Sequence, residues 1–255
     1  MSFGTLTFRS STIGRSKSLN FILPDPGAGR GPYPVFYLLH GYSDDHTGWL
    51  MNTRLVEYVA GLPLVVIMPD CEHSFYCDEV HGKPFERYLM EEIRGLVEAN
   101  FNVRRTGKAR CVGGLSMGGG GAMKLGLKYP ELFTSVGAHS GGMDFGRYRP
   151  DRMGMLAESK RILGSTAKNN PQRQANDPFA LAEALTPGKH PALYFDCGTE
   201  DFLLPGNRDL HAHLEQLGLP HVYQEFPGVH CWQYWDEHIQ DSLAFHCRAL
   251  GIKKG

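Results

Sequence analysis

The sequence lacks any apolar run long enough to cross a bilayer, and its first residues contain no continuous apolar core of signal-peptide length. We therefore expect a cytoplasmic protein. Net charge is also nearly absent, because 26 basic side chains stand against 27 acidic ones and leave −1. This balance gives no electrostatic reason for binding to nucleic acid or to an anionic membrane, so we expect neither as a partner.

Cysteine is sparse, and its spacing is not that of a metal site. The six cysteines include no CxxC pair, which is the spacing typical of structural zinc. In a chain without an export signal we expect reduced, mostly buried thiols and no bound metal. The length of 255 residues and the hydrophobic content of 42% suit one large α/β domain over residues 1–255. Assembly into a homo-oligomer stays open at this level.

Short apolar runs rich in Val, Ile, Leu and aromatic residues recur along the chain, as in strands buried on both faces of a parallel sheet. They read PVFYLLHG, LPLVVIMPD, ARCVGGLS, SVGAHSG, PALYFDCG and HVYQEF. Two earlier segments, LTFRSS and SLNFIL, alternate loosely, as strands at a sheet edge do. Stretches of helical period lie between the later runs, at 85–101, 207–219 and 233–250. The alternation predicts an α/β fold with a mostly parallel central sheet and helices on both faces.

One segment, 141–190, interrupts this alternation. It is polar, basic in its middle and far longer than a usual connection. It holds too few large apolar residues to form a core of its own. We expect a cap-like insertion with short helices, lying over the C-terminal edge of the sheet within the single domain.

The stretch CVGGLSMGGGG contains a G-x-S-x-G motif at Gly114–Gly118, after a predicted strand and before a predicted helix. The chain must reverse sharply there, which leaves the serine in a strained conformation with its hydroxyl exposed. Side chains two residues before and two residues after the serine would collide, so both positions need glycine. Ser116 is therefore the candidate nucleophile, and the alternative is a glycine-rich loop without catalytic meaning.

A serine hydroxyl needs a base and an orienting acid, and after such an elbow the chain order is serine, acid, histidine. Three acids follow the strand PALYFDCG: Asp196 lies inside the strand and suits a structural role, whereas Glu200 and Asp201 lie just beyond it. Among twelve histidines, His230 alone lies in a loop between the last predicted strand and the last helix. His40 and His139 also end strands, but both precede the acids.

The oxyanion of a tetrahedral intermediate needs two N–H donors. One is expected from Met117, the residue after the nucleophile, and the other from Tyr42 in the loop LLHGYSDDHTGW. A plain glycine turn at Gly41 is the alternative. The residues Gly41, Trp49, Phe75, Tyr76, Phe202 and Leu203 are near these loops in sequence and are candidates for the substrate pocket, although aromatic residues in such places serve as often in a core.

Several blocks of the sequence together resemble the esterase D group of α/β-hydrolases, which includes S-formylglutathione hydrolases, tributyrin-type acetyl esterases and feruloyl-type esterases. The blocks are PVFYLLHGYSDDHTGW, LVVIMPD with SFY, GGLSMGGGGAMKLGLKYPELF, NDPFALA, DCGTEDFLLPGN and EFPGVHCWQYWDEHI. The resemblance implies the α/β-hydrolase fold and a triad of Ser116, Asp201 and His230. It also implies an oxyanion hole from the backbone of Tyr42 and Met117.

The resemblance implies a serine carboxylesterase acting on short-chain acyl esters or thioesters without a metal or organic cofactor. S-formylglutathione hydrolase and a feruloyl- or acetyl-xylan-type esterase are narrower alternatives. An acyltransferase and a catalytically silent binding protein are alternatives from other classes. The chain departs from the pattern at the acidic SDD after Gly41, at GVHC around His230 and at an extra glycine after Ser116. These departures remove no catalytic group, and the sequence does not define the acyl and alcohol pockets.

Overall fold

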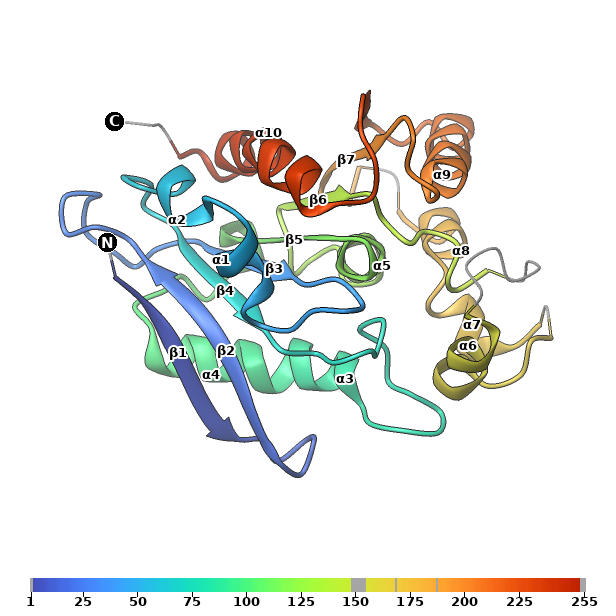
Figure 1. Cartoon of the computed structure of the whole chain (residues 1–255), viewed down its shortest axis with the longest axis horizontal. Helices are drawn as coiled ribbons and strands as arrows, with labels where there is room; N and C mark the ends of the chain where they lie inside the picture. Colours follow the sequence, from blue (N-terminus) through green and yellow to red (C-terminus); the bar gives the residue numbers. More distant parts are fainter. Residues whose placement is uncertain (1, 148–154, 168, 187, 253–255) are drawn as a thin grey trace.

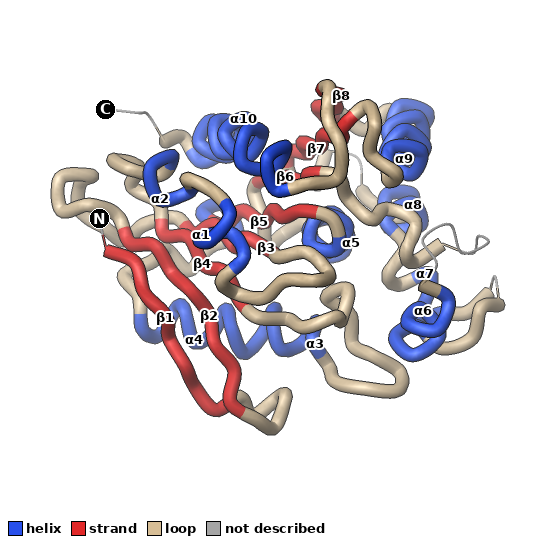
Figure 2. Tube along the Cα trace, viewed as in Figure 1, coloured by secondary structure: helices blue, strands red, loops and turns tan. Residues whose placement is uncertain are grey.

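The computed structural model describes residues 2–147, 155–167, 169–186 and 188–252. Eight strands of this part of the chain form one sheet, in the order β1-β2-β4-β3-β5-β6-β7-β8 (Figures 1 and 2). The strands are β1 Ser2–Arg9, β2 Ser16–Leu23, β3 Val35–Leu39, β4 Val65–Pro69, β5 Arg110–Leu115, β6 Ser135–His139, β7 Ala192–Gly198 and β8 His221–Phe226.

The prediction of a mostly parallel sheet is confirmed. Strands β4, β3, β5, β6, β7 and β8 run parallel to one another in that order, whereas β1 pairs antiparallel with β2, and β2 pairs antiparallel with β4. Strands β3, β4, β5 and β6 are buried along their whole length, which explains why their sequences read as continuous apolar runs.

Helices cover both faces of the sheet (Figure 1). One face carries α1 Gly48–Asn52, α2 Leu55–Tyr58 and α10 Trp232–Leu250. The other carries α5 Met117–Lys128, α9 Leu204–Gln216 and a helical stretch made of α3 Phe85–Arg87, the π-helix η1 Tyr88–Ile93 and α4 Arg94–Asn100. A 3₁₀ turn, η2 Gly107–Ala109, precedes β5. None of the helices described here combines the length and the apolar character that a membrane span requires.

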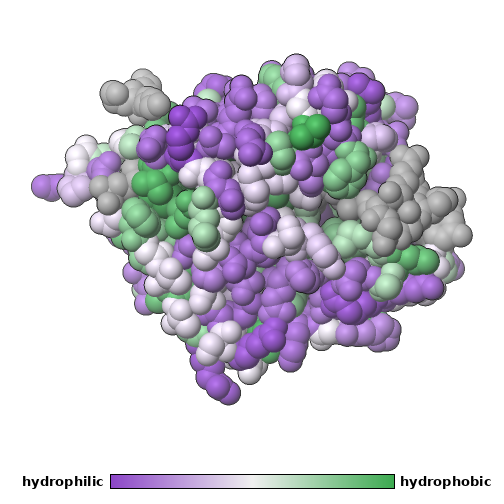
Figure 3. Space-filling view, viewed as in Figure 1, coloured by the Kyte–Doolittle hydropathy of each residue, from purple (hydrophilic) through white to green (hydrophobic). Residues whose placement is uncertain are grey.

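Each face of the sheet has its own hydrophobic core. On the face of α10, Trp235, Ile239 and Leu243 pack with Trp49 of α1 and with Leu55 of α2. On the opposite face, residues of η1, α4, α5 and α9 form a larger cluster. The exterior presented in the same view is mostly hydrophilic (Figure 3).

The segment 141–190 contributes three short helices: α6 Leu156–Leu163, α7 Pro171–Gln174 and α8 Pro178–Glu183. Asn170 caps α7 and Asp177 caps α8, each accepting a backbone N–H through its side chain and each followed by proline, which is a strong helix-start signal. Phe179 and Ala182 of α8 pack into the core on the α5 face. Part of the expected insertion, residues 148–154, 168 and 187, lies outside the described residues.

Candidate active site

Ser116 occupies the junction between β5 and α5. Its backbone, with φ 52° and ψ −117°, has a conformation that residues other than glycine rarely adopt. Three backbone hydrogen bonds hold it there. Its N–H donates to the carbonyl of His139 over 2.9 Å, and its own carbonyl accepts the N–H groups of Gly120 and Gly142 over 3.0 and 2.9 Å. The backbone on both sides of the serine is thereby fixed, and the strain at this residue is balanced by the surrounding structure.

The glycines around Ser116 are needed for close approach of backbone. A Cβ on Gly114 would lie 2.6 Å from the carbonyl oxygen of Leu39, and a Cβ on Gly118 would lie 2.5 Å from the same oxygen. A Cβ on Gly121 would collide with the ring of Tyr76. The glycine run therefore allows both the reversal of the chain and the tight seating of the first turn of α5.

The structure brings Ser116, His230 and Asp201 together from three segments. The Nε2 of His230 lies 2.9 Å from the Oγ of Ser116, and its Nδ1 lies 2.8 Å from the Oδ2 of Asp201. The Asp201 side chain is completely buried, and its Oδ1 accepts the Leu203 N–H over 2.8 Å. Because a carboxylate only accepts, Nδ1 carries the proton of a neutral imidazole and Nε2 is left to take the proton of the serine.

The competing acids have other partners. Asp196 lies in β7 and is fully buried, with Oδ2 2.7 Å from His139 Nδ1 and Oδ1 accepting the hydroxyl of Tyr234 over 2.9 Å. Glu200 is exposed and accepts the hydroxyl of Thr199 and the N–H of Gly228. Neither of these carboxylates is hydrogen-bonded to His230 in the described part of the chain, whereas Asp201 is.

Hydrogen bonds of the His40 ring and the His40 carbonyl hold the His40–Gly41 turn in place. The Nδ1 of His40 donates to the Gly41 carbonyl over 2.7 Å, and its Nε2 accepts the Cys71 N–H over 3.0 Å. Burial lowers the pKa of His40, in keeping with a neutral ring that donates on one side and accepts on the other. The hydroxyl of Tyr76 donates to the His40 carbonyl over 2.8 Å. These contacts make His40 a structural support of the turn.

Among the described residues, two backbone N–H groups have no acceptor within the protein: one lies just after the His40–Gly41 turn and the other just after Ser116. Within the described part of the chain, neither the Tyr42 N–H nor the Met117 N–H donates to another protein group. Met117 is also the first residue of α5, so the positive end of the helix dipole is directed at the same place. Both donors are available to an anion that forms beside Ser116.

A cavity of about 610 Å³ opens at Ser116 and His230, a size typical of small-molecule sites. Of the pocket candidates, Gly41, Phe75 and Phe202 line it. The lining also includes residues that the sequence did not single out as pocket residues: Ser43, Asp44, Asn52, Leu115, Met155, Cys231, Trp232, Gln233 and Trp235.

Three pocket candidates do not line the cavity. The Trp49 side chain is buried in the core beside α10, and its Nε1 donates to the Leu39 carbonyl over 3.0 Å. Leu203 and Tyr76 are buried as well. The wall comes instead from Trp232 and Trp235, which are one helical turn apart at the start of α10. The sequence shows their i, i+3 spacing, but the direction in which the two side chains point depends on the residue at which α10 begins.

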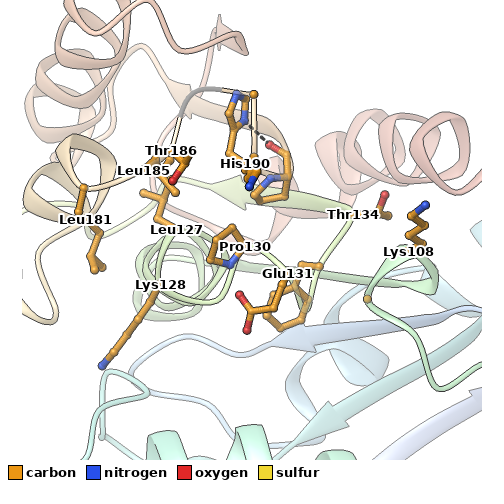
Figure 4. A pocket seen from close by; sticks show the side chains of 16 residues that line it. Lys108, Leu127, Lys128, Pro130, Glu131, Thr134, Leu181, Leu185, Thr186 and His190 are labelled. Atoms are coloured by element: carbon orange, nitrogen blue, oxygen red, sulfur yellow. Dashed lines mark hydrogen bonds between the residues drawn. The ribbon is translucent and has the colours of Figure 1, made fainter.

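A second cavity, of about 670 Å³, lies where the end of α5 meets the end of α8 and the approach to β7 (Figure 4). Lys108, Lys128, Glu131 and His190 are among the residues that line it, and the described residues of its lining include no serine or cysteine. The Nδ1 of His190 is 2.9 Å from the Pro191 carbonyl. Among the described residues, no group of three His, Cys, Asp or Glu side chains is arranged to hold a metal ion.

Comparison with known proteins places the chain among esterases. The Esterase family model matches residues 10–246. An acetyl esterase from Caldicellulosiruptor saccharolyticus is 32% identical over 219 residues, which cover 82% of this chain and 81% of that protein. The structure of S-formylglutathione hydrolase (FrmB) from Staphylococcus aureus is similar with a TM-score of 0.82 and 26% identity, over 96% of this chain and 98% of that one.

A transferase is also among the relatives. The diacylglycerol acyltransferase/mycolyltransferase Ag85A from Mycobacterium tuberculosis (strain ATCC 25618 / H37Rv) is 28% identical over 277 residues, which cover 95% of this chain and 80% of that protein. The family model nevertheless spans most of the chain, and its matched region contains the elbow serine and the histidine and carboxylate beside it. The chain belongs to the Esterase family and is a carboxylic ester hydrolase with the α/β-hydrolase fold.

Proposed function

We propose that the protein is a serine carboxylesterase that hydrolyses short-chain acyl esters or thioesters with Ser116 as nucleophile, His230 as base and Asp201 as orienting acid. One observation carries the proposal. The continuous hydrogen-bonded chain from Asp201 through His230 to the hydroxyl of Ser116 ends at a cavity of about 610 Å³.

In the acylation step, His230 takes the proton of Ser116 as Oγ attacks the carbonyl carbon of the ester. The carbonyl oxygen becomes an oxyanion, which the N–H groups of Tyr42 and Met117 stabilise. The protonated His230 then gives its proton to the departing alcohol or thiol. Asp201 holds the imidazole in the required tautomer and stabilises its charged form.

In the deacylation step, water replaces the alcohol. His230 removes a proton from that water as it attacks the acyl-enzyme, and it returns the proton to Ser116 as the carboxylic acid leaves. The same two N–H groups stabilise the second oxyanion. These steps use only groups of the protein and water.

The cavity wall supports a role for the segment 141–190 as a cap. Met155, at the start of α6, lines the cavity together with Ser116 and His230. Phe202 stands at the rim, with 63% of its surface exposed, and its ring centre lies 4.6 Å from that of His230. We propose that Met155 and Phe202 confine the substrate above the nucleophile.

Within this function, S-formylglutathione and feruloyl esters are narrower candidate substrates, which a panel of esters graded by acyl length distinguishes. The similarity to Ag85A gives acyl transfer a specific argument as the second candidate. Incubation of an acyl donor with an alcohol or sugar acceptor separates the two reactions. A transferase forms the acylated acceptor in preference to the free acid, whereas an esterase releases the acid.

The test of the proposed function is covalent labelling followed by kinetics. An organophosphate should add one phosphonyl group to the wild-type protein, seen by intact mass, and none to the Ser116→Ala variant. The same variant should lose roughly 10⁴-fold or more in kcat on a neutral acetate ester. Ser242→Ala is the matched control, because Ser242 also lies 2.8 Å from a histidine Nε2 but is buried away from the cavity. Retention of most activity by Ser116→Ala would overturn the proposal.

A further inference from the structure

The catalytic cavity has a carboxylate in its wall that the mechanism does not use. Asp44 follows the His40–Gly41 turn and lines the cavity together with Gly41 and Ser116. Its neighbour Asp45 is outside the lining. The Asp45 side chain is 51% exposed and accepts the N–H and the hydroxyl of Thr47. Two adjacent carboxylates therefore have different surroundings.

Close contacts with two glycines fix the Asp44 side chain. The Asp44 N–H donates to the Gly41 carbonyl over 3.3 Å, and the backbone of Gly41 lowers the pKa of the Asp44 carboxyl against the larger effect of burial. A Cβ on Gly41 would lie 2.8 Å from the Asp44 Oδ2 and 3.8 Å from the Ser116 Cβ. A Cβ on Gly48 would lie 3.2 Å from the Asp44 Cβ. The carboxylate thus occupies space that the absence of side chains at Gly41 and Gly48 leaves open, in the cavity that Ser116 also lines.

No cation of the described chain neutralises this carboxylate. Asp44 forms no ion pair there, and the described lining of the cavity contains no lysine or arginine. Burial raises the pKa of Asp44, because the charged form has lost part of its hydration. The aromatic rings of Phe202, Trp232 and Trp235 also line the cavity, and aromatic faces attract cations.

We propose that Asp44 determines the charge preference of the esterase, so that substrates with a quaternary ammonium or protonated amine beside the Gly41 turn are favoured and anionic ones are disfavoured. The inference rests on the proposed function. A fixed negative charge in a partly desolvated cavity attracts a cation and repels an anion at close range, and both effects raise discrimination between substrates of similar shape.

The experiment compares two acetates of the same shape. Acetylcholine and 3,3-dimethylbutyl acetate differ in the replacement of a charged nitrogen by carbon. The ratio of their kcat/KM values is measured in wild type, in Asp44→Asn and in Asp45→Asn. We expect the ratio to fall about tenfold in Asp44→Asn and to change less than about twofold in Asp45→Asn. Asparagine has nearly the shape of aspartate and keeps an acceptor oxygen, and the backbone bond from the Asp44 N–H to the Gly41 carbonyl does not depend on the side chain.

A second pair places the charge on the acyl side. The p-nitrophenyl esters of 4-trimethylammoniobutanoate and of 5,5-dimethylhexanoate are again matched in shape. A selective fall of the ratio in Asp44→Asn for either pair supports the proposal and identifies the side of the ester that lies beside Asp44. Equal ratios in wild type and Asp44→Asn for both pairs, or an equal fall in Asp45→Asn, overturn it. Turnover of the neutral esters, and its loss in Ser116→Ala, tests the proposed function separately.

Discussion

Asp196 and Asp201 accept hydrogen bonds from two different histidines at the same end of β7. Asp196 lies 2.7 Å from the Nδ1 of His139, and Asp201 lies 2.8 Å from the Nδ1 of His230. The Nε2 of each histidine is close to a serine hydroxyl: that of His139 to Ser242, and that of His230 to Ser116. Residue types alone therefore do not distinguish the two arrangements. Only the one with Ser116 faces a cavity.

Asparagine at each of these aspartates should separate catalysis from stability. We expect Asp201→Asn to lower kcat by roughly 10⁴-fold while the protein stays folded, because the imidazole loses its required tautomer. Asp196→Asn should lower the free energy of unfolding by about 1–3 kcal/mol, since buried polar groups lose a charged partner, with kcat of the folded protein changed less than about tenfold. Chemical unfolding and kinetics on one neutral ester measure both. The opposite pattern would show that the acid is assigned wrongly.

Alanine at Gly118 should damage both the fold and the chemistry. Its Cβ would lie 2.5 Å from the Leu39 carbonyl and 2.6 Å from the His40 carbonyl, and both are backbone atoms that cannot rotate away. We expect a loss of about 2 kcal/mol or more in unfolding free energy and a lower kcat. Gly95→Ala is the control. Gly95 lies in α4 with open space where a Cβ would go, so this change should stabilise by about 0.5–1 kcal/mol.

Modification of Cys231 should block the cavity. This thiol is half-buried, follows His230 directly and lines the cavity, so a bulky maleimide on it would occupy substrate space. We expect the reagent to inactivate the wild-type protein and the Cys247→Ala variant. Cys231→Ala should remain active and resist the reagent, because Cys247, the other half-buried thiol, is not in the lining. Inactivation of Cys231→Ala at the wild-type rate would contradict this prediction.

Stability should fall in acid through Glu86. Burial raises the pKa of this carboxyl, but Lys124 and Lys128 outweigh burial and bring the pKa down to about 2 from 4.5. Its distances to the two ammonium groups are 3.0 and 2.6 Å. A pKa lowered by folding stabilises the protein fully above pH 4.5, and this contribution is lost as the pH falls toward 2.

The size of the Glu86 contribution is about 3 kcal/mol. The difference in unfolding free energy between wild type and Glu86→Gln, measured by urea denaturation, should therefore shrink between pH 6 and pH 3. Glu237 is exposed, so Glu237→Gln serves as the control and should follow the wild-type curve. A wild-type-like pH dependence in Glu86→Gln would exclude Glu86 as the source.

Much of the fold could be predicted because strand burial leaves a direct mark on sequence. The runs that became β3, β4, β5 and β6 are apolar throughout since both faces are covered. The apolar residues over 85–101 predict a helical stretch. The structure places the π-helix η1 between α3 and α4, and hydrophobic periodicity does not resolve a local change of helix pitch.

The candidate site also has residues that the sequence predicts and one choice that the residues alone leave open. Ser116 could be found because its turn requires glycine at fixed offsets, and His230 because the chain order and the loop position single it out. Between Glu200 and Asp201, the residues alone did not decide. The structure holds Glu200 at Thr199 and Gly228, and only Asp201 faces the imidazole.

The pocket could not be predicted in the same way, since nearness in sequence does not fix the direction of a side chain. Trp49 lies in α1, close in sequence to the His40–Gly41 turn, yet its ring points into the core beneath α10. Trp232 and Trp235 reach the cavity because α10 begins at Trp232. The position of Asp44 depends on the empty space at Gly41 and Gly48, which no residue pattern encodes.

The cavity wall is built from parts of unequal tolerance to change. Ser116 directly follows the buried strand β5, and Gly41 lies two residues beyond the buried strand β3. A Cβ on Gly41 would lie 2.7 Å from the Leu115 Cδ1 and 2.8 Å from the Asp44 Oδ2. Met155, Phe202 and Gln233 come from three separate segments at the rim of the cavity, and none of them is among the hydrogen-bond partners of Ser116 or His230 in the described part of the chain. New substrate ranges can therefore arise by mutation of the rim alone, and a library restricted to these three positions would diversify specificity while the reaction centre stays constant.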